Sequence, residues 1–215
     1  MFIGHFAVGL AVKKAAPKVS LGWLFMAVQF ADLLWPLLLL LGLERVRIAP
    51  GTTAVTPLDF VSYPYSHSLL FDLIWGAAFF LVYNLIQRDT LGAAVLGACV
   101  VSHWVLDFVS HRPDVPLVPG GARYGLGLWF SRPATVAVEG ALFAFGVATY
   151  ARATKPLEKT GIFSFWSLVA FLIVMYLGNL FGPPPPSEKA LALFANFAWL
   201  LVLWGFWIDR HRAGT

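Results

Sequence analysis

The sequence predicts an all-α protein: a polytopic bundle of about six transmembrane helices with a short membrane helix at its N-terminus. Of the 215 residues, 59% are hydrophobic and 12% are charged, and the mean hydropathy is +0.76. A soluble domain usually carries roughly 25% charged residues. The surplus apolar surface must therefore face lipid, and six windows approach the roughly 20 apolar residues that a helix needs to cross a bilayer.

The predicted spans follow one another along the whole chain, with short breaks between them. They cover residues 21–43, 66–86, 90–110, 133–151, 161–181 and 191–208. An apolar segment at residues 2–12 is too short to span, and we expect a partial helix that turns back near Pro17. The four prolines at 183–186 predict a stiff, extended link. Two longer loops, 44–65 and 112–132, are rich in Pro and Gly, and loops of this length are often functional.

These spans form a single domain, 1–215, in which residues 1–140 carry the candidate site and residues 161–208 add two further spans. Alternating spans place nine Lys and Arg residues on one side and six on the other. The positive-inside rule makes the richer side cytoplasmic, so we expect a multi-pass protein of the bacterial inner membrane with both long loops outside the cytoplasm. The dispersed basic residues indicate no nucleic-acid partner, and they leave the oligomeric state open.

Several ionisable residues fall within the predicted apolar segments, where an Asp costs about 2.5–3.5 kcal/mol to insert. Such residues persist where they face a cavity, a partner or a metal. They are His5, Asp32, His67, Asp72, His103, Asp107, His111 and Glu139. With alternating topology, all except Asp72, which we keep as a supporting candidate, are expected at a similar depth in the outer half of the bilayer. A shared metal site explains this convergence.

The most specific group closes the third predicted span. His103, Asp107 and His111 are spaced four residues apart, so their side chains fall within about 80° of arc on one helix face. Imidazole and carboxylate on adjacent turns suit a divalent cation such as zinc. Cys99 is the only cysteine, which excludes a thiolate cluster. The alternative is a helix end that reaches the polar interface, where ionisable residues cost little.

Four motifs resemble the YdjM-like family of predicted membrane-bound metal-dependent hydrolases, over about the first 140 residues. They are Gly4-His5, the segment from Ala31 to Pro36, the segment from Tyr65 to Leu69 and the segment from Ser102 to Asp107. The resemblance implies a membrane-bound hydrolase that depends on a metal.

The order of the polar residues is also similar to that in zinc-dependent phospholipase C and the single-strand-specific zinc nucleases, which cleave phosphodiesters. That similarity implies one metal held by Asp32, His67, His103 and Asp107, with Asp107 bridging to a second that His5 also binds. It assigns His111 and Glu139 to a third. This chain departs from the pattern in two ways. Those enzymes use the amine of the mature N-terminus as a ligand, whereas here Met1 lies four residues before His5. They also have one more His before the final Glu, whereas no His lies between His111 and Glu139 here. We therefore expect one or two ions, with zinc as the expected metal.

The combined prediction is a hydrolase of a lipid-borne ester, with a phosphoester as the expected bond. Asp32 is the candidate general base, and Arg112 would offset phosphate charge. The candidate substrate contacts are Tyr65, Ser66, Arg112 and Asp114. Tyr65 can equally belong to an aromatic belt, Arg112 can be a plain loop cation, and Asp59 is expected to be solvated. Two alternatives use the same residues: a cation or proton transporter, and a non-catalytic protein with a structural metal.

Overall fold

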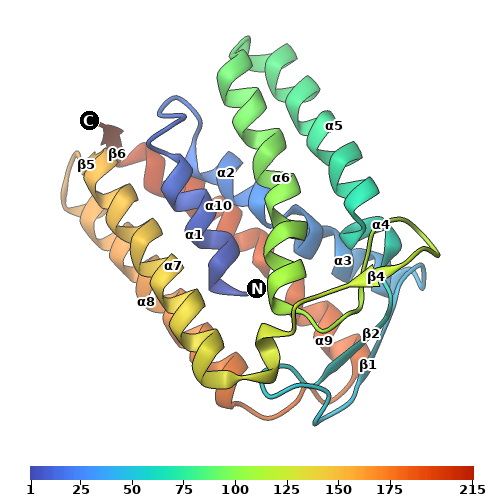
Figure 1. The fold of residues 1–215 in the computed structure, drawn as a ribbon. Helices are drawn as coiled ribbons and strands as arrows, with labels where there is room; N and C mark the ends of the chain where they lie inside the picture. The colour runs from blue at the N-terminus through green and yellow to red at the C-terminus, as the bar shows by residue number, and fades with distance from the viewer.

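The computed structural model describes all residues, 1–215, and it confirms the all-α class (Figure 1). Five helices are long and apolar enough to cross a membrane. They are α5 (Leu69–Gln87), α6 (Thr90–Ser110), α7 (Arg132–Ala153), α8 (Lys159–Phe181) and the combined stretch Glu188–Arg210, which contains α9 (Glu188–Ala195) and α10 (Ala198–Arg210). A bent pair, α2 (Leu21–Val28) with α3 (Phe30–Leu40), raises the number to six if the pair is one span.

The window at 21–43 is not the single continuous helix that its hydropathy suggests. The axes of α2 and α3 differ by 56°, and the break falls at Gln29, whose φ of −107° and ψ of 7° lie outside the helical region. Pro36 lies inside α3, where its ring nitrogen has no hydrogen to donate to the carbonyl of Asp32, four residues earlier. The two irregularities flank Asp32, so the backbone around this carboxylate departs from regular helical bonding.

Side-chain caps explain where most of the long helices begin. Ser20, Ser68, Asp89, Ser131 and Ser187 each accept a hydrogen bond from a backbone N–H in the first turn of α2, α5, α6, α7 and α9, respectively. The cap at Ser68 separates α5 from a one-turn helix, α4 (Pro64–His67). The prediction that His67 opens the second span is therefore corrected: His67 ends α4, just before the spanning helix starts.

The two long loops fold into small antiparallel hairpins on one side of the bundle (Figure 1). In the first, β1 (Arg45–Ile48) pairs with β2 (Leu58–Ser62). In the second, β3 (Val115–Pro116) pairs with β4 (Arg123–Tyr124), and a 3₁₀ turn, η1 (Leu128–Phe130), follows. A third pair, β5 (Thr154–Pro156) with β6 (Arg212–Gly214), ties the C-terminus to the opposite end.

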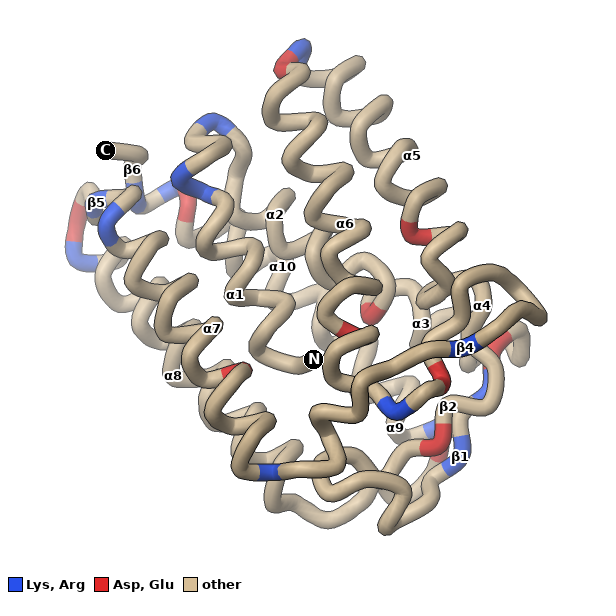
Figure 2. The backbone as a smooth tube through the Cα atoms, in the orientation of Figure 1, with Lys and Arg blue, Asp and Glu red and all other residues tan.

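The short first helix, α1 (Ile3–Val12), is enclosed by the longer ones and contacts α2, α6 and α7. Its approach to α7 depends on Gly146, where an added Cβ would lie 2.5 Å from the carbonyl oxygen of Ala7. Small residues allow this kind of close helix contact in membranes. Lys and Arg lie at the helix ends and in the loops and hairpins, whereas isolated acidic positions occur within α5, α6 and α7 (Figure 2).

Candidate metal centre

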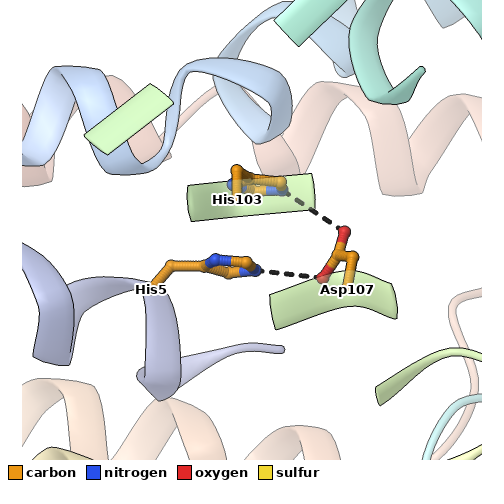
Figure 3. A group of neighbouring side chains, drawn as sticks. All are labelled: His5, His103 and Asp107. Atoms are coloured by element: carbon orange, nitrogen blue, oxygen red, sulfur yellow. Dashed lines mark hydrogen bonds and ion pairs between the residues drawn. The ribbon is translucent and has the colours of Figure 1, made fainter. Parts of the chain in front are cut away.

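The carboxylate of Asp107, on α6, is the centre of a cluster of four imidazoles. Figure 3 shows it with two of them, those of His5 and His103. Its Oδ1 lies 3.1 Å from Nε2 of His5. Its Oδ2 lies 3.4 Å from Nε2 of His103, 3.6 Å from Nε2 of His111 and 3.8 Å from Nε2 of His67. Residues from α1, α4, α6 and the following loop therefore direct their Nε2 atoms toward one carboxylate.

Two sets of three residues place one ligand atom each within 4.8 Å of one another: His5, His103 and Asp107, and Asp32, His67 and His103. The rings of His5 and His103 are stacked, with centroids 3.8 Å apart. The side chains of these five residues are at most 4% exposed, except that of Asp32, which is 40% exposed. The site is thus closed on most sides and open at Asp32.

The break between α2 and α3 explains how His103 is held. In an unbroken helix the carbonyl of Val28 would accept a hydrogen bond from the N–H of Asp32. The bend directs this carbonyl to His103 instead, whose Nδ1 lies 2.8 Å away. Because a carbonyl can only accept, Nδ1 of His103 must carry the hydrogen, and a neutral His103 then has its lone pair on Nε2.

His111 joins the cluster by a different route from the one that helical spacing predicts. The helix α6 ends at Ser110, and His111 is the C-cap with an extended ψ of 155°, so the prediction that all three residues share a helix face is corrected for His111. Its N–H still donates to the carbonyl of Asp107, at 2.8 Å. Its Nδ1 lies 3.1 Å from Oδ1 of Asp114, and the ring packs against Trp129, with centroids 4.2 Å apart.

His67 is held by a carboxylate that the sequence did not reveal. Nδ1 of His67 lies 2.7 Å from the hydroxyl of Ser66, which in turn donates to Oε2 of Glu44 at 2.6 Å. Glu44 is buried, although it precedes β1 in a segment that the sequence marks only as a loop. A lone Glu separated from Ser66 by 22 positions gives no spacing signal, so only the fold identifies it.

Two of the separations between the four ligands fit a four-coordinate cation, whereas the His67–Asp107 and His103–Asp32 separations, 3.8 Å and 3.9 Å, are longer. Nε2 of His103 is buried and has no hydrogen-bond partner. Its separation from Asp107, and that of His67 from Asp32, are both 3.4 Å. Zinc bonds of 2.0–2.2 Å in a tetrahedron place neighbouring ligand atoms about 3.3–3.6 Å apart. An unprotonated Nε2 and a carboxylate oxygen repel each other at this distance, and a cation between them would remove the repulsion.

Two further groups lie at the edge of the cluster. The amino nitrogen of Met1 contacts Oδ1 of Asp107 and lies 3.0 Å from Nε2 of His5. Glu139 is in neither set of three: its Oε2 accepts hydrogen bonds from the backbone N–H groups of Phe2, at 2.9 Å, and Gly4, at 3.4 Å. The structure therefore places Glu139 at the N-terminus of α1, where a carboxylate is favourable.

Arg112 belongs to a chain of ion pairs between the loop after α6 and the first hairpin. Its guanidinium donates to Oδ2 of Asp114 at 2.9 Å and also contacts Asp59. Asp59 in turn accepts from Arg47, at 2.5 Å and 3.0 Å, so the expectation that Asp59 is solvated is corrected. These bonds, above all those from Arg47, lower the pKa of Asp59 below its usual range. Burial and then Asp114 raise the pKa of Tyr63, whose hydroxyl donates to that carboxylate.

The remaining predicted residues lie close to the site without contacting its centre. The side chain of Ser66 is fully buried, whereas Tyr65 is 41% exposed. Asp72, on α5, is also fully buried, and both of its carboxylate oxygens lack a hydrogen-bond partner. Of the expected substrate contacts, Tyr65 is therefore open to the outside, while Ser66 and Asp114 are engaged in holding histidines.

No protein-family model, curated protein or solved structure matches this chain. The resemblance to the YdjM-like family thus stays a prediction from the motifs, and the geometry of the side chains carries the functional argument.

Proposed function

We propose that this chain is a membrane-embedded, metal-dependent hydrolase that acts on a lipid-borne ester, with a phosphoester as the expected bond. We place it in the bacterial inner membrane with the site toward the extracytoplasmic side. The His and Asp ligand atoms of the cluster support a metal ion there, because neutral imidazole and carboxylate together suit zinc. One ion would lie among Asp32, His67, His103 and Asp107, and a second between Asp107 and His5.

The observation that carries a catalytic role is the exposure of Asp32. A structural metal site is closed, whereas a catalytic site keeps a position open for water and substrate. Three of the residues around the first ion have side chains that are at most 4% exposed, and that of Asp32 is 40% exposed. The one accessible edge of the cluster therefore carries a carboxylate that an entering water molecule can reach.

Each residue of the site then has its own role in the proposed reaction. A bound divalent cation supplies Lewis acidity toward the ester oxygen and makes a nearby water more acidic. Asp32 accepts the proton of the attacking water at its exposed carboxylate. His67 and His103 keep their Nε2 atoms directed inward, and the buried walls exclude bulk water from the other sides. Arg112 is already paired with Asp59 and Asp114, so we assign it to holding Asp114 and not to binding phosphate.

The test uses the purified full-length protein in vesicles of mixed bacterial lipids, with and without chelator, followed by readdition of zinc. We expect products that appear only with metal and that Asp32→Asn abolishes even at zinc concentrations that saturate its weakened site, because Asp32 is both a proposed ligand and the proposed base. Glu188→Gln, an exposed carboxylate on α9, is the matched control and should behave as the wild type. A folded, zinc-loaded protein that releases no product from any lipid would contradict the proposal. Unfolding on removal of zinc, without any activity, would indicate a structural metal instead.

A further inference from the structure

We propose that Glu44 is a positioning residue for the metal centre: through the hydroxyl of Ser66, it holds His67 in the tautomer whose Nε2 lone pair faces Asp32 and Asp107. The inference rests on the proposed function, because it explains how one ligand of that site is prepared. It concerns the resting arrangement of the side chains, however, so it can be tested without substrate.

Hydrogen-bond donors surround the carboxylate of Glu44. This carboxylate is buried, and Oε1 accepts hydrogen bonds from the backbone N–H groups of Tyr65, at 2.8 Å, and Ser66, at 2.9 Å. Oε2 accepts from the Ser66 hydroxyl at 2.6 Å. All three partners of this buried carboxylate are donors, so both of its oxygens act as acceptors.

The hydroxyl hydrogen of Ser66 points to Glu44 and not to His67. A hydroxyl has one hydrogen to donate, and that of Ser66 donates it to Oε2 of Glu44. Toward His67, Ser66 can then only accept, and its Oγ lies 2.7 Å from Nδ1 of the ring. Nδ1 of His67 therefore carries the hydrogen, and the neutral ring has its lone pair on Nε2.

The lone pair on Nε2 of His67 faces the carboxylates of the cluster. Nε2 of His67 lies 3.4 Å from Oδ1 of Asp32 and 3.8 Å from Oδ2 of Asp107. An Nε2 that carried a hydrogen would donate it to a carboxylate and could not bind a cation. The choice of tautomer, made by Glu44 on the far side of Ser66, therefore decides whether His67 is a ligand.

The substitution Glu44→Gln should reverse the tautomer of His67 with little change in shape. The amide keeps the size of the side chain, and its oxygen can still accept from the two backbone N–H groups. Its NH₂ group would then face Ser66 and donate to the hydroxyl oxygen. Ser66 would be free to donate its own hydrogen to Nδ1 of His67, which moves the ring hydrogen to Nε2 and removes the lone pair from the site.

The chain has five histidines, so selective ¹⁵N labelling gives a simple spectrum. We would record it on metal-free protein in detergent, at a pH where the rings are neutral, and assign His67 by its loss in His67→Asn. We expect a protonated Nδ1 in the wild type and a protonated Nε2 in Glu44→Gln. Zinc affinity, measured by competition with a chelator, should fall about 10- to 100-fold in Glu44→Gln. Glu188→Gln is the matched control and should change neither reading.

Each outcome decides the inference. A wild-type His67 with its hydrogen on Nε2 overturns it without any variant. An unchanged tautomer and unchanged zinc affinity in folded Glu44→Gln also overturn it. If Glu44→Gln does not fold, Ser66→Ala gives the second test, since loss of the acceptor at Nδ1 should populate both tautomers and weaken zinc binding. If the tautomer changes as expected but no lipid is hydrolysed, the inference stands and the proposed function fails.

Discussion

Nε2 of His5 lies 3.1 Å from Oδ1 of Asp107, although 102 positions separate the two residues in the sequence. This contact joins the short helix α1 to the spanning helix α6 at the centre of the cluster. The other oxygen of Asp107 faces three further imidazoles, so a single carboxylate connects both groups of candidate ligands. Asp107 is therefore the residue on which the geometry of the whole centre depends.

We predict that Asp107→Asn abolishes binding of the second ion and strongly weakens binding of the first. The amide keeps the shape of the side chain but removes the charge that both positions share. The buried amino group of Met1 would also lose its ion pair, and breaking a buried pair costs about 3–5 kcal/mol. Metal analysis and thermal unfolding of the same sample measure the two effects. A variant that binds zinc with the wild-type stoichiometry would show that Asp107 is not a bridge.

Close packing of α1 on α7 gives a second prediction, which concerns stability. Gly146→Ala places a Cβ 2.5 Å from a backbone oxygen of Ala7, so the helices must separate, and overpacking of this kind costs about 1–3 kcal/mol. Because α1 carries His5, metal affinity should also fall. Gly140→Ala, on the same helix, meets no atom within 4 Å and serves as the control. Equal unfolding temperatures for the two variants in one detergent would contradict the expected role of the close contact.

The sequence predicts the spanning helices well because their signal is local. A run of apolar residues fixes both the helix and its length, and the window at 90–110 coincides with α6 (Thr90–Ser110). Hydropathy does not predict the break at Gln29, because the residues on both sides remain apolar. What the break provides is a free carbonyl at Val28 for His103, and this is a contact between distant segments that hydropathy does not record.

The candidate site was predictable to the extent that its residues are costly in a membrane. Asp32, His67, His103 and Asp107 attract notice because apolar helices rarely carry them, and the structure brings all four together. Glu44 lies in a polar loop, where a carboxylate needs no explanation. Its burial appears only in the fold, where it accepts hydrogen bonds from Tyr65 and Ser66 of α4, so the residues that hold the ligands are harder to predict than the ligands themselves.

The ion pairs of the first hairpin predict a dependence of stability on pH. Because Arg47 and Arg112 lower the pKa of Asp59, this carboxylate contributes stability above its unfolded pKa of about 4. The contribution is lost as the pH falls through the lower, folded value. We expect the unfolding temperature to drop at acidic pH, and less so in Asp59→Asn. The difference should be small, since the side chain of Arg47 is 70% exposed. Matching profiles for the two proteins would contradict it.

The last prediction separates two roles for Arg112. If Arg112 acts by holding Asp114, which in turn orients His111 against the shared ligand Asp107, then Arg112→Gln and Asp114→Asn should lower zinc affinity in the same direction, by up to about tenfold. The double variant should lose little more than the stronger single one, because both act on one ring. If Arg112 instead binds the phosphate of the substrate, Arg112→Gln should leave zinc affinity unchanged and raise KM. Zinc competition and steady-state kinetics on the same preparations therefore distinguish a holder of the ligand from a contact with the substrate.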